Sequence, residues 1–125
     1  WAIDAKIPQS VTYTLEYPVY LDKVRIISGV NRNDHHVTGI NLQYTAEDGT
    51  VTTILDASVN EDSEATQDSQ SGNIQLSKIL KDYTVVFPLT AKTKKLTLKA
   101  LQSDLGAINN FVLTEVIISG EPYLH

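Results

Sequence analysis

The 125-residue sequence contains no cysteine, one tryptophan and only two phenylalanines. Without cysteine there can be no disulfide framework, no thiol nucleophile and no thiolate metal site. No apolar run approaches the roughly 20 residues that a membrane-spanning helix needs. Catalytic signatures are missing as well: we find no HExxH zinc motif, no GxSxG nucleophile elbow and no glycine-rich phosphate loop. These absences favour a protein that is not an enzyme.

The net charge of −5 is concentrated in one segment, residues 56–73. This segment holds five acidic residues and no basic one, which leaves ten acidic and ten basic residues in the rest of the chain. A local excess of acid argues against nucleic-acid binding. The segment is also rich in serine, asparagine and glutamine, and such a composition buries too little apolar surface to fold alone. We therefore expect a mobile surface excursion at residues 56–73.

Apolar and polar residues alternate along several stretches, as they do in strands that have one face on a core. The clearest case is residues 40–45, where Ile40, Leu42 and Tyr44 alternate with polar neighbours. An Asp48-Gly49 turn and a second alternating run at 51–55 follow, and together they predict a β-hairpin.

The same pattern predicts further strands at residues 10–17, 20–28, 83–87, 95–101 and 112–119. Pro18 is expected to end the first of these, because proline cannot donate a hydrogen bond to a ladder. Residues 74–80 are ambiguous between helix and strand. Seven or eight strands with short turns and no convincing long helix predict an all-β fold, a single antiparallel β-sandwich over residues 1–125.

The order of these segments resembles the discoidin or coagulation-factor type C domains and their galactose-binding-like relatives among the carbohydrate-binding modules. Three blocks carry the resemblance: residues 8–15 continuing into 20–26, residues 40–44 with the acid-glycine turn at 48–49, and residues 96–98 with the closing strand at 113–120. The blocks span most of residues 8 to 122. The likeness lies in their order and spacing, since each block alone is mostly apolar alternation.

The resemblance implies a jelly-roll-like sandwich that binds its ligand through loops at one tip. Sugar-binding members take an arginine and an asparagine from the loop after the second long strand, and Arg32 and Asn33 stand there in this chain. They take an aromatic from the loop before the closing strand, where this chain has Phe111 after Asn109 and Asn110. Amides and guanidinium groups suit sugar hydroxyls, which donate and accept hydrogen bonds together. The competing interpretations are a solvated loop for Arg32 and Asn33 and a core position for Phe111.

The pair His35-His36 has two possible roles. Imidazole is a common metal ligand, but adjacent residues on a strand point to opposite faces and no other histidine or cysteine lies nearby. We therefore favour hydrogen bonds from His35 or His36 to sugar hydroxyls over a metal. For the metal, the resemblance implies a structural calcium ion, with Glu115 at a position that members use near it. The calcium loop of many members precedes a tryptophan, and this sequence begins at Trp1.

The leading hypothesis is a non-catalytic carbohydrate-binding module that recognises a glycan. The N-terminus has neither a start methionine nor a signal peptide, so we interpret the chain as a piece of a larger secreted or cell-surface protein, such as an enzyme or adhesin. Two alternatives remain: an adhesion domain of the same fold that binds a protein or lipid surface, and a structural spacer. The polar loops at 31–36 and 103–110 favour sugar over lipid.

Overall fold

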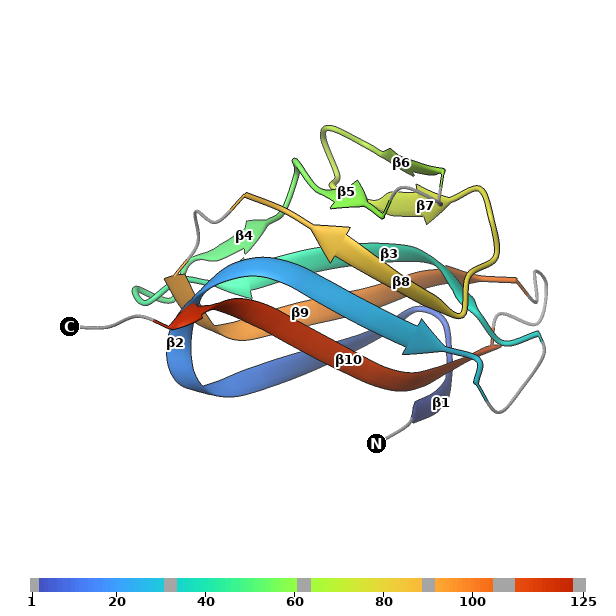
Figure 1. Cartoon of the computed structure of the whole chain (residues 1–125), viewed down its shortest axis with the longest axis horizontal. Helices are drawn as coiled ribbons and strands as arrows, with labels where there is room; N and C mark the ends of the chain where they lie inside the picture. Colours follow the sequence, from blue (N-terminus) through green and yellow to red (C-terminus); the bar gives the residue numbers. More distant parts are fainter. Residues whose placement is uncertain (1–2, 31–33, 61–63, 89–91, 105–109, 123–125) are drawn as a thin grey trace.

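The described part of the chain is built from antiparallel β-strands joined by turns and loops (Figure 1). The computed structural model describes the whole chain except residues 1–2, 31–33, 61–63, 89–91, 105–109 and 123–125. Its strands are β1 Ile3–Lys6, β2 Gln9–Ser28, β3 Val37–Thr45, β4 Val51–Thr53, β5 Ser58–Val59, β6 Ala65–Gln67, β7 Ile74–Leu76, β8 Asp82–Val86, β9 Lys92–Ser103 and β10 Asn110–Pro122. Among the described residues no helix is long and apolar enough to cross a membrane.

Strand β2 joins the two layers of a sandwich, as Figure 1 shows where the long blue strand bends back on itself. The first part of β2 pairs with β9, which pairs in turn with β3. The second part of β2 lies between β10 and β8. Strands β4 and β7 extend the layer that contains β3, and β1 and β5 extend the other layer. The predicted antiparallel sandwich is confirmed.

The predicted break at Pro18 is wrong, because β2 runs without interruption through this position. Pairing between β2 and β9 lapses between Thr14 and Val19 and then resumes. A proline is tolerated in a strand at such an irregularity, because no hydrogen bond from its backbone nitrogen to the neighbouring strand is needed there. The proline therefore lies at the bend where β2 passes from one layer to the other.

The core is formed by the inward-facing side chains of both layers. Its largest fully buried members are Tyr83 and Phe111. Around them pack aliphatic residues from all the long strands, among them Leu21, Val24, Ile26, Val37, Ile40, Leu42, Val85, Leu96, Leu98 and Leu113. The alternation in the sequence therefore identified the inward face of β9, where Leu96, Leu98 and Ala100 are buried. Strand β3 differs, because all its residues from Val37 to Leu42 are buried.

The predicted hairpin is present as β3 and β4. The Ala46 amide donates to the Thr50 carbonyl at 2.8 Å, and Gly49 has a φ of 89°. A positive φ is nearly free of cost for glycine, which explains the acid-glycine signal in the sequence. The ambiguous stretch at 74–80 begins with strand β7.

The expectation that residues 56–73 form an unstructured excursion is wrong for the part of the segment that the structure describes. Strand β5 pairs with β8, and β6 pairs with β7. Gln67 explains how so polar a segment is held: its Nε2 donates to the carbonyls of Ile54 and Gly72, and its Oε1 accepts from the Ala57 amide. The composition of the segment does not reveal these strands, because an edge strand can be stabilised by hydrogen bonds rather than by apolar burial.

Candidate functional site

Four strand ends meet at one end of the sandwich, where β2 and β9 end and β3 and β10 begin (Figure 1). The Gly29 amide donates to the Val112 carbonyl at 2.8 Å, and the Val112 amide donates to the His35 carbonyl at 3.0 Å. The Asp104 amide donates to the His36 carbonyl at 3.1 Å. These bonds tie the bases of the two polar loops together. We call this end the loop tip.

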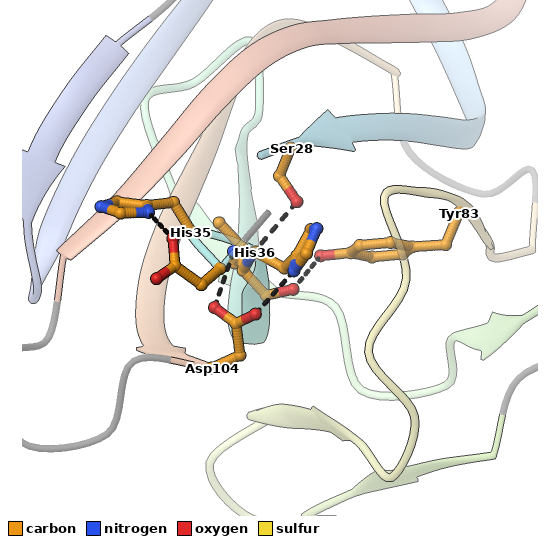
Figure 2. A network of polar contacts seen from close by, with 7 residues as sticks. Ser28, His35, His36, Tyr83 and Asp104 are labelled. Carbon is orange, nitrogen blue, oxygen red and sulfur yellow. Dashed lines mark hydrogen bonds and ion pairs between the residues drawn. The ribbon is translucent and has the colours of Figure 1, made fainter. Parts of the chain in front are cut away.

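A buried pair, His36 and Asp104, lies at the base of the loop tip (Figure 2). The His36 amide donates to Asp104 Oδ1 at 2.8 Å, and His36 Nδ1 lies 2.6 Å from Asp104 Oδ2. The side chains are 4% and 6% exposed. One carboxylate thus holds both the backbone and the ring of the same histidine. We call these two residues the tip clamp.

The two ring nitrogens of His36 have different surroundings. Nδ1 shares a hydrogen bond with Asp104 Oδ2. The other ring nitrogen, Nε2, is buried and has no hydrogen-bond partner among the described residues. The ring is packed against Gly29, where an added Cβ would lie 2.6 Å from His36 Cδ2. Gly29 also has a φ of 67°, so the turn and the close approach both require glycine.

Two further side chains hold the start of β3 in place beside the tip clamp, as Figure 2 shows. Ser28 Oγ accepts a hydrogen bond from the Val37 amide at 3.2 Å, and the Tyr83 hydroxyl donates to the Val37 carbonyl at 3.4 Å. Complete burial raises the pKa of Tyr83 above its usual value, which keeps its hydroxyl protonated as a donor. The base of the loop tip is therefore a rigid support.

His35 points away from the tip clamp (Figure 2), as expected for a residue next to His36 on an extended chain. Its Nδ1 lies 2.6 Å from Asp34 Oδ1, and its side chain is 14% exposed. Because the two rings diverge, they do not converge on one ion. Among the described residues there is no group of three or more histidine, cysteine, aspartate or glutamate side chains that could hold a metal.

Two predicted sugar contacts need correction. Phe111 is fully buried within the core cluster, so its ring does not present a face to a ligand. His36 is buried in the tip clamp and bound to Asp104, so it is a support for the site and not a contact. No local sequence pattern identifies Asp104 as the partner of His36, because the two residues are 68 positions apart.

The other predicted contacts have different outcomes. Asn110 begins β10 and is half-buried, and its Oδ1 is buried without a hydrogen-bond partner among the described residues. Arg32, Asn33 and Asn109 lie outside the residues that the structure describes. Of the predicted contacts, His35 and Asn110 are therefore the two that the structure describes at the loop tip without contradicting them.

Glu115, the predicted calcium neighbour, is exposed on β10 opposite Ile27 of β2. The pKa of Arg25 is raised, chiefly by its hydrogen bond to Asp82 and in smaller part by the charge of Glu115. The calcium ion stays a prediction.

Comparison with known proteins supports the fold. No protein-family model matches the sequence, and no curated protein matches it. Among solved structures, the chain is similar to the family 32 carbohydrate-binding module of Clostridium perfringens NanJ, solved in complex with galactose. The TM-score is 0.65 with 13% identity, over 91% of this chain and 68% of that one.

A second similar structure is a family 32 carbohydrate-binding module from a family 31 glycoside hydrolase of Clostridium perfringens. Its TM-score is 0.59 with 18% identity, over 96% of this chain and 75% of that one. At these identities the likeness establishes a shared fold. The galactose-binding-like fold that the sequence resembled is confirmed.

Proposed function

We propose that this chain is a non-catalytic carbohydrate-binding module that holds a glycan at the loop tip. The observation that carries the proposal is the tip clamp, which fixes the bases of two polar loops side by side on a sandwich of the fold seen in family 32 modules. Binding sites commonly lie on loops that a rigid scaffold positions. Arg32, Asn33 and Asn109 are the proposed principal contacts, with His35 and Asn110 beside them.

The chemistry of these side chains suits a sugar. Amide and guanidinium groups donate in planar pairs, and a sugar presents neighbouring hydroxyls at matching spacing. Asp34 is exposed and its carboxylate adds a strong acceptor beside His35. Because Phe111 is in the core, we expect polar contacts rather than stacking on this ring to provide the selectivity.

Single hydrogen-bonding sites of this kind bind weakly, and tethering would raise the effective concentration at a polysaccharide. We therefore propose that the module belongs to a larger secreted or cell-surface protein, where it directs an enzyme or adhesin to its glycan. A structural calcium ion near Glu115 remains part of this proposal.

The test is a calorimetric titration with galactose, followed by a glycan array. Arg32→Ala is expected to abolish binding. Arg25→Ala is the matched control, because the two residues are the only arginines in the sequence and Arg25 is paired with Asp82 on a strand. If the Arg32→Ala variant binds the sugar as tightly as the wild type does, the loop tip is not the binding site. Binding to liposomes with none to glycans would instead favour the adhesion-domain alternative.

A further inference from the structure

A hollow lies on the outer face of the β3 layer, lined by residues of β3, β6, β7 and β9 and of the turn between β6 and β7. Its volume is about 430 Å³, within the usual range for small-molecule sites. Polar side chains dominate its lining: Thr66, Asp68, Asn73, Gln75 and Gln102. None of these residues belongs to the predicted loop-tip site. The hollow and the loop tip are nevertheless close along the chain, since Gln102 is two positions before Asp104.

The hollow is built by four neighbouring strands whose register places their residues in one row. Thr66 of β6 pairs with Gln75 of β7, Gln75 pairs with Gly39 of β3, and Gly39 pairs with Gln102 of β9. Residues directly opposite each other project to the same face of a sheet. The two glutamines therefore stand on either side of a glycine that has no side chain. They form the walls of a trough whose floor is the Gly39 backbone.

The strand geometry at Gly39 is irregular on both sides. The register with β9 shifts between Val37 and Gly39, which leaves Thr38 as an extra residue on β3. It shifts again between Gly39 and Ile40, which leaves Leu101 as an extra residue on β9. Bulges of this kind redirect side chains and are common beside functional sites. A Cβ at Gly39 would lie 2.9 Å from Gln102 Cβ, so glycine is required for the close approach. Any larger residue would also fill the trough.

The far end of the hollow is held by the turn between β6 and β7. Asp68 Oδ1 accepts from the amides of Gln70 and Ser71, at 2.8 and 3.2 Å, and these bonds lower the pKa of Asp68. Asn41 Nδ2 donates to Asn73 Oδ1 at 2.9 Å. This bond sets the orientation of the Asn73 amide and leaves its NH₂ group as a donor. Two of the five polar side chains of the hollow, Asp68 and Asn73, are thus oriented before any ligand arrives.

We propose that this hollow is a second saccharide-binding site, which takes an uncharged sugar residue. Three planar amides, one hydroxyl and one carboxylate offer both donors and acceptors, as adjacent sugar hydroxyls require. Asp68 is the one ionised side chain among the residues that line the hollow, and its negative charge disfavours anionic sugars. The inference shares only its class of ligand with the proposed function and does not depend on the loop tip.

The experiment is a titration of the isotope-labelled 125-residue chain with galactose, glucose, mannose and N-acetylglucosamine, followed by NMR. The side-chain amide signals of Asn73, Gln75 and Gln102 and the backbone amide of Gly39 report on the hollow. The backbone amides of His35 and Asn110 report on the loop tip. At least one sugar is expected to shift the hollow signals in a saturable way.

The variant that tests the assignment is Gln75→Ala combined with Gln102→Ala. Both side chains are exposed, so the fold should be retained. Loss of two hydrogen bonds is expected to weaken binding, followed at Gly39 and Asn73, by about ten- to thirty-fold. Gln9→Ala is the matched control, an exposed glutamine on β2 outside the hollow, and it should change nothing.

The two proposals have separate outcomes. Shifts at the hollow that disappear in the double variant and persist in Arg32→Ala would establish an independent second site. Shifts at the loop tip alone would overturn the second site and leave the proposed function standing. If none of the four sugars shifts either set of NMR signals, both proposals are overturned for uncharged monosaccharides.

Discussion

Two hydrogen-bonded side-chain pairs with similar distances between their polar atoms lie in different environments. His36 and Asp104 are 2.6 Å apart at the base of the loop tip, with side chains 4% and 6% exposed. Arg25 and Asp82 are 2.5 Å apart on the outer face of β2 and β8, with side chains 49% and 45% exposed. Water and dissolved salt screen the interaction between Arg25 and Asp82, whereas His36 and Asp104 are almost completely shielded from solvent.

The contrast separates two kinds of polar side-chain pair in one small domain. In the tip clamp, loss of one partner leaves the other buried without compensation, so the two loops cannot easily separate. In the surface pair, either partner can turn to water when the other is lost. The distances between the polar atoms alone would suggest that the two pairs contribute equally to stability. Burial is what should make the loop tip rigid and leave the outer face tolerant of change.

The largest effect of a substitution on stability is expected at Phe111, where the loop tip meets the core. Phe111→Ala should lower the free energy of unfolding by about 4 kcal/mol, because it removes a fully buried ring and leaves a cavity. Urea denaturation measures the loss. Phe111→Leu is the control and should cost only about 1 kcal/mol, since most of the apolar volume remains. A Phe111→Ala protein that is as stable as the wild type but no longer binds sugar would show that Phe111 contacts the ligand, as the sequence analysis predicted.

The tip clamp is expected to come next. Asp104→Ala should lower the free energy of unfolding by about 3 kcal/mol, because the Nδ1 and the backbone amide of His36 both lose their hydrogen-bond partner in a buried site. The measurement is again urea denaturation, with glycan affinity determined on the folded fraction. Asp104→Asn keeps one acceptor and should fall between the wild type and Asp104→Ala. A loss no greater than that of the surface pair would remove the contrast between the two regions.

These residues also show what sequence reasoning could reach. The strands were predictable because Ile40, Leu42 and Tyr44 alternate with polar residues, and alternation is a local property. The tip clamp was not predictable, because its partners are far apart in sequence and meet only after β3 and β9 pair. Phe111 was assigned to the ligand because a position beside a polar loop does not tell which way a ring points.

The glycine beside the tip clamp allows a smaller and sharper test. Gly29→Ala should cost about 2 kcal/mol, because it combines an unfavourable positive φ with a clash against the His36 ring. Gly49→Ala is the matched control: its φ is also positive, but an added Cβ would meet nothing within 4 Å. The difference between the two variants in thermal unfolding measures the tight packing of His36. Equal losses would mean that the ring moves aside freely.

The smallest effect is expected at the surface pair, where pH gives the clearest readout. The hydrogen bond from Arg25 holds the pKa of Asp82 below its ordinary value of 3.8. The stabilisation is therefore complete above that value and is lost as the pH falls through the lower pKa of the folded state. Asp82→Asn should remove this acid-dependent part of the unfolding free energy and change stability little near neutral pH. Added salt at about 1 M, where the Debye length is roughly 3 Å, should weaken the contribution of this pair and leave the tip clamp almost unchanged. A salt response of equal size in Asp104→Ala and Asp82→Asn, each measured against the wild type, would show that burial does not distinguish the two pairs.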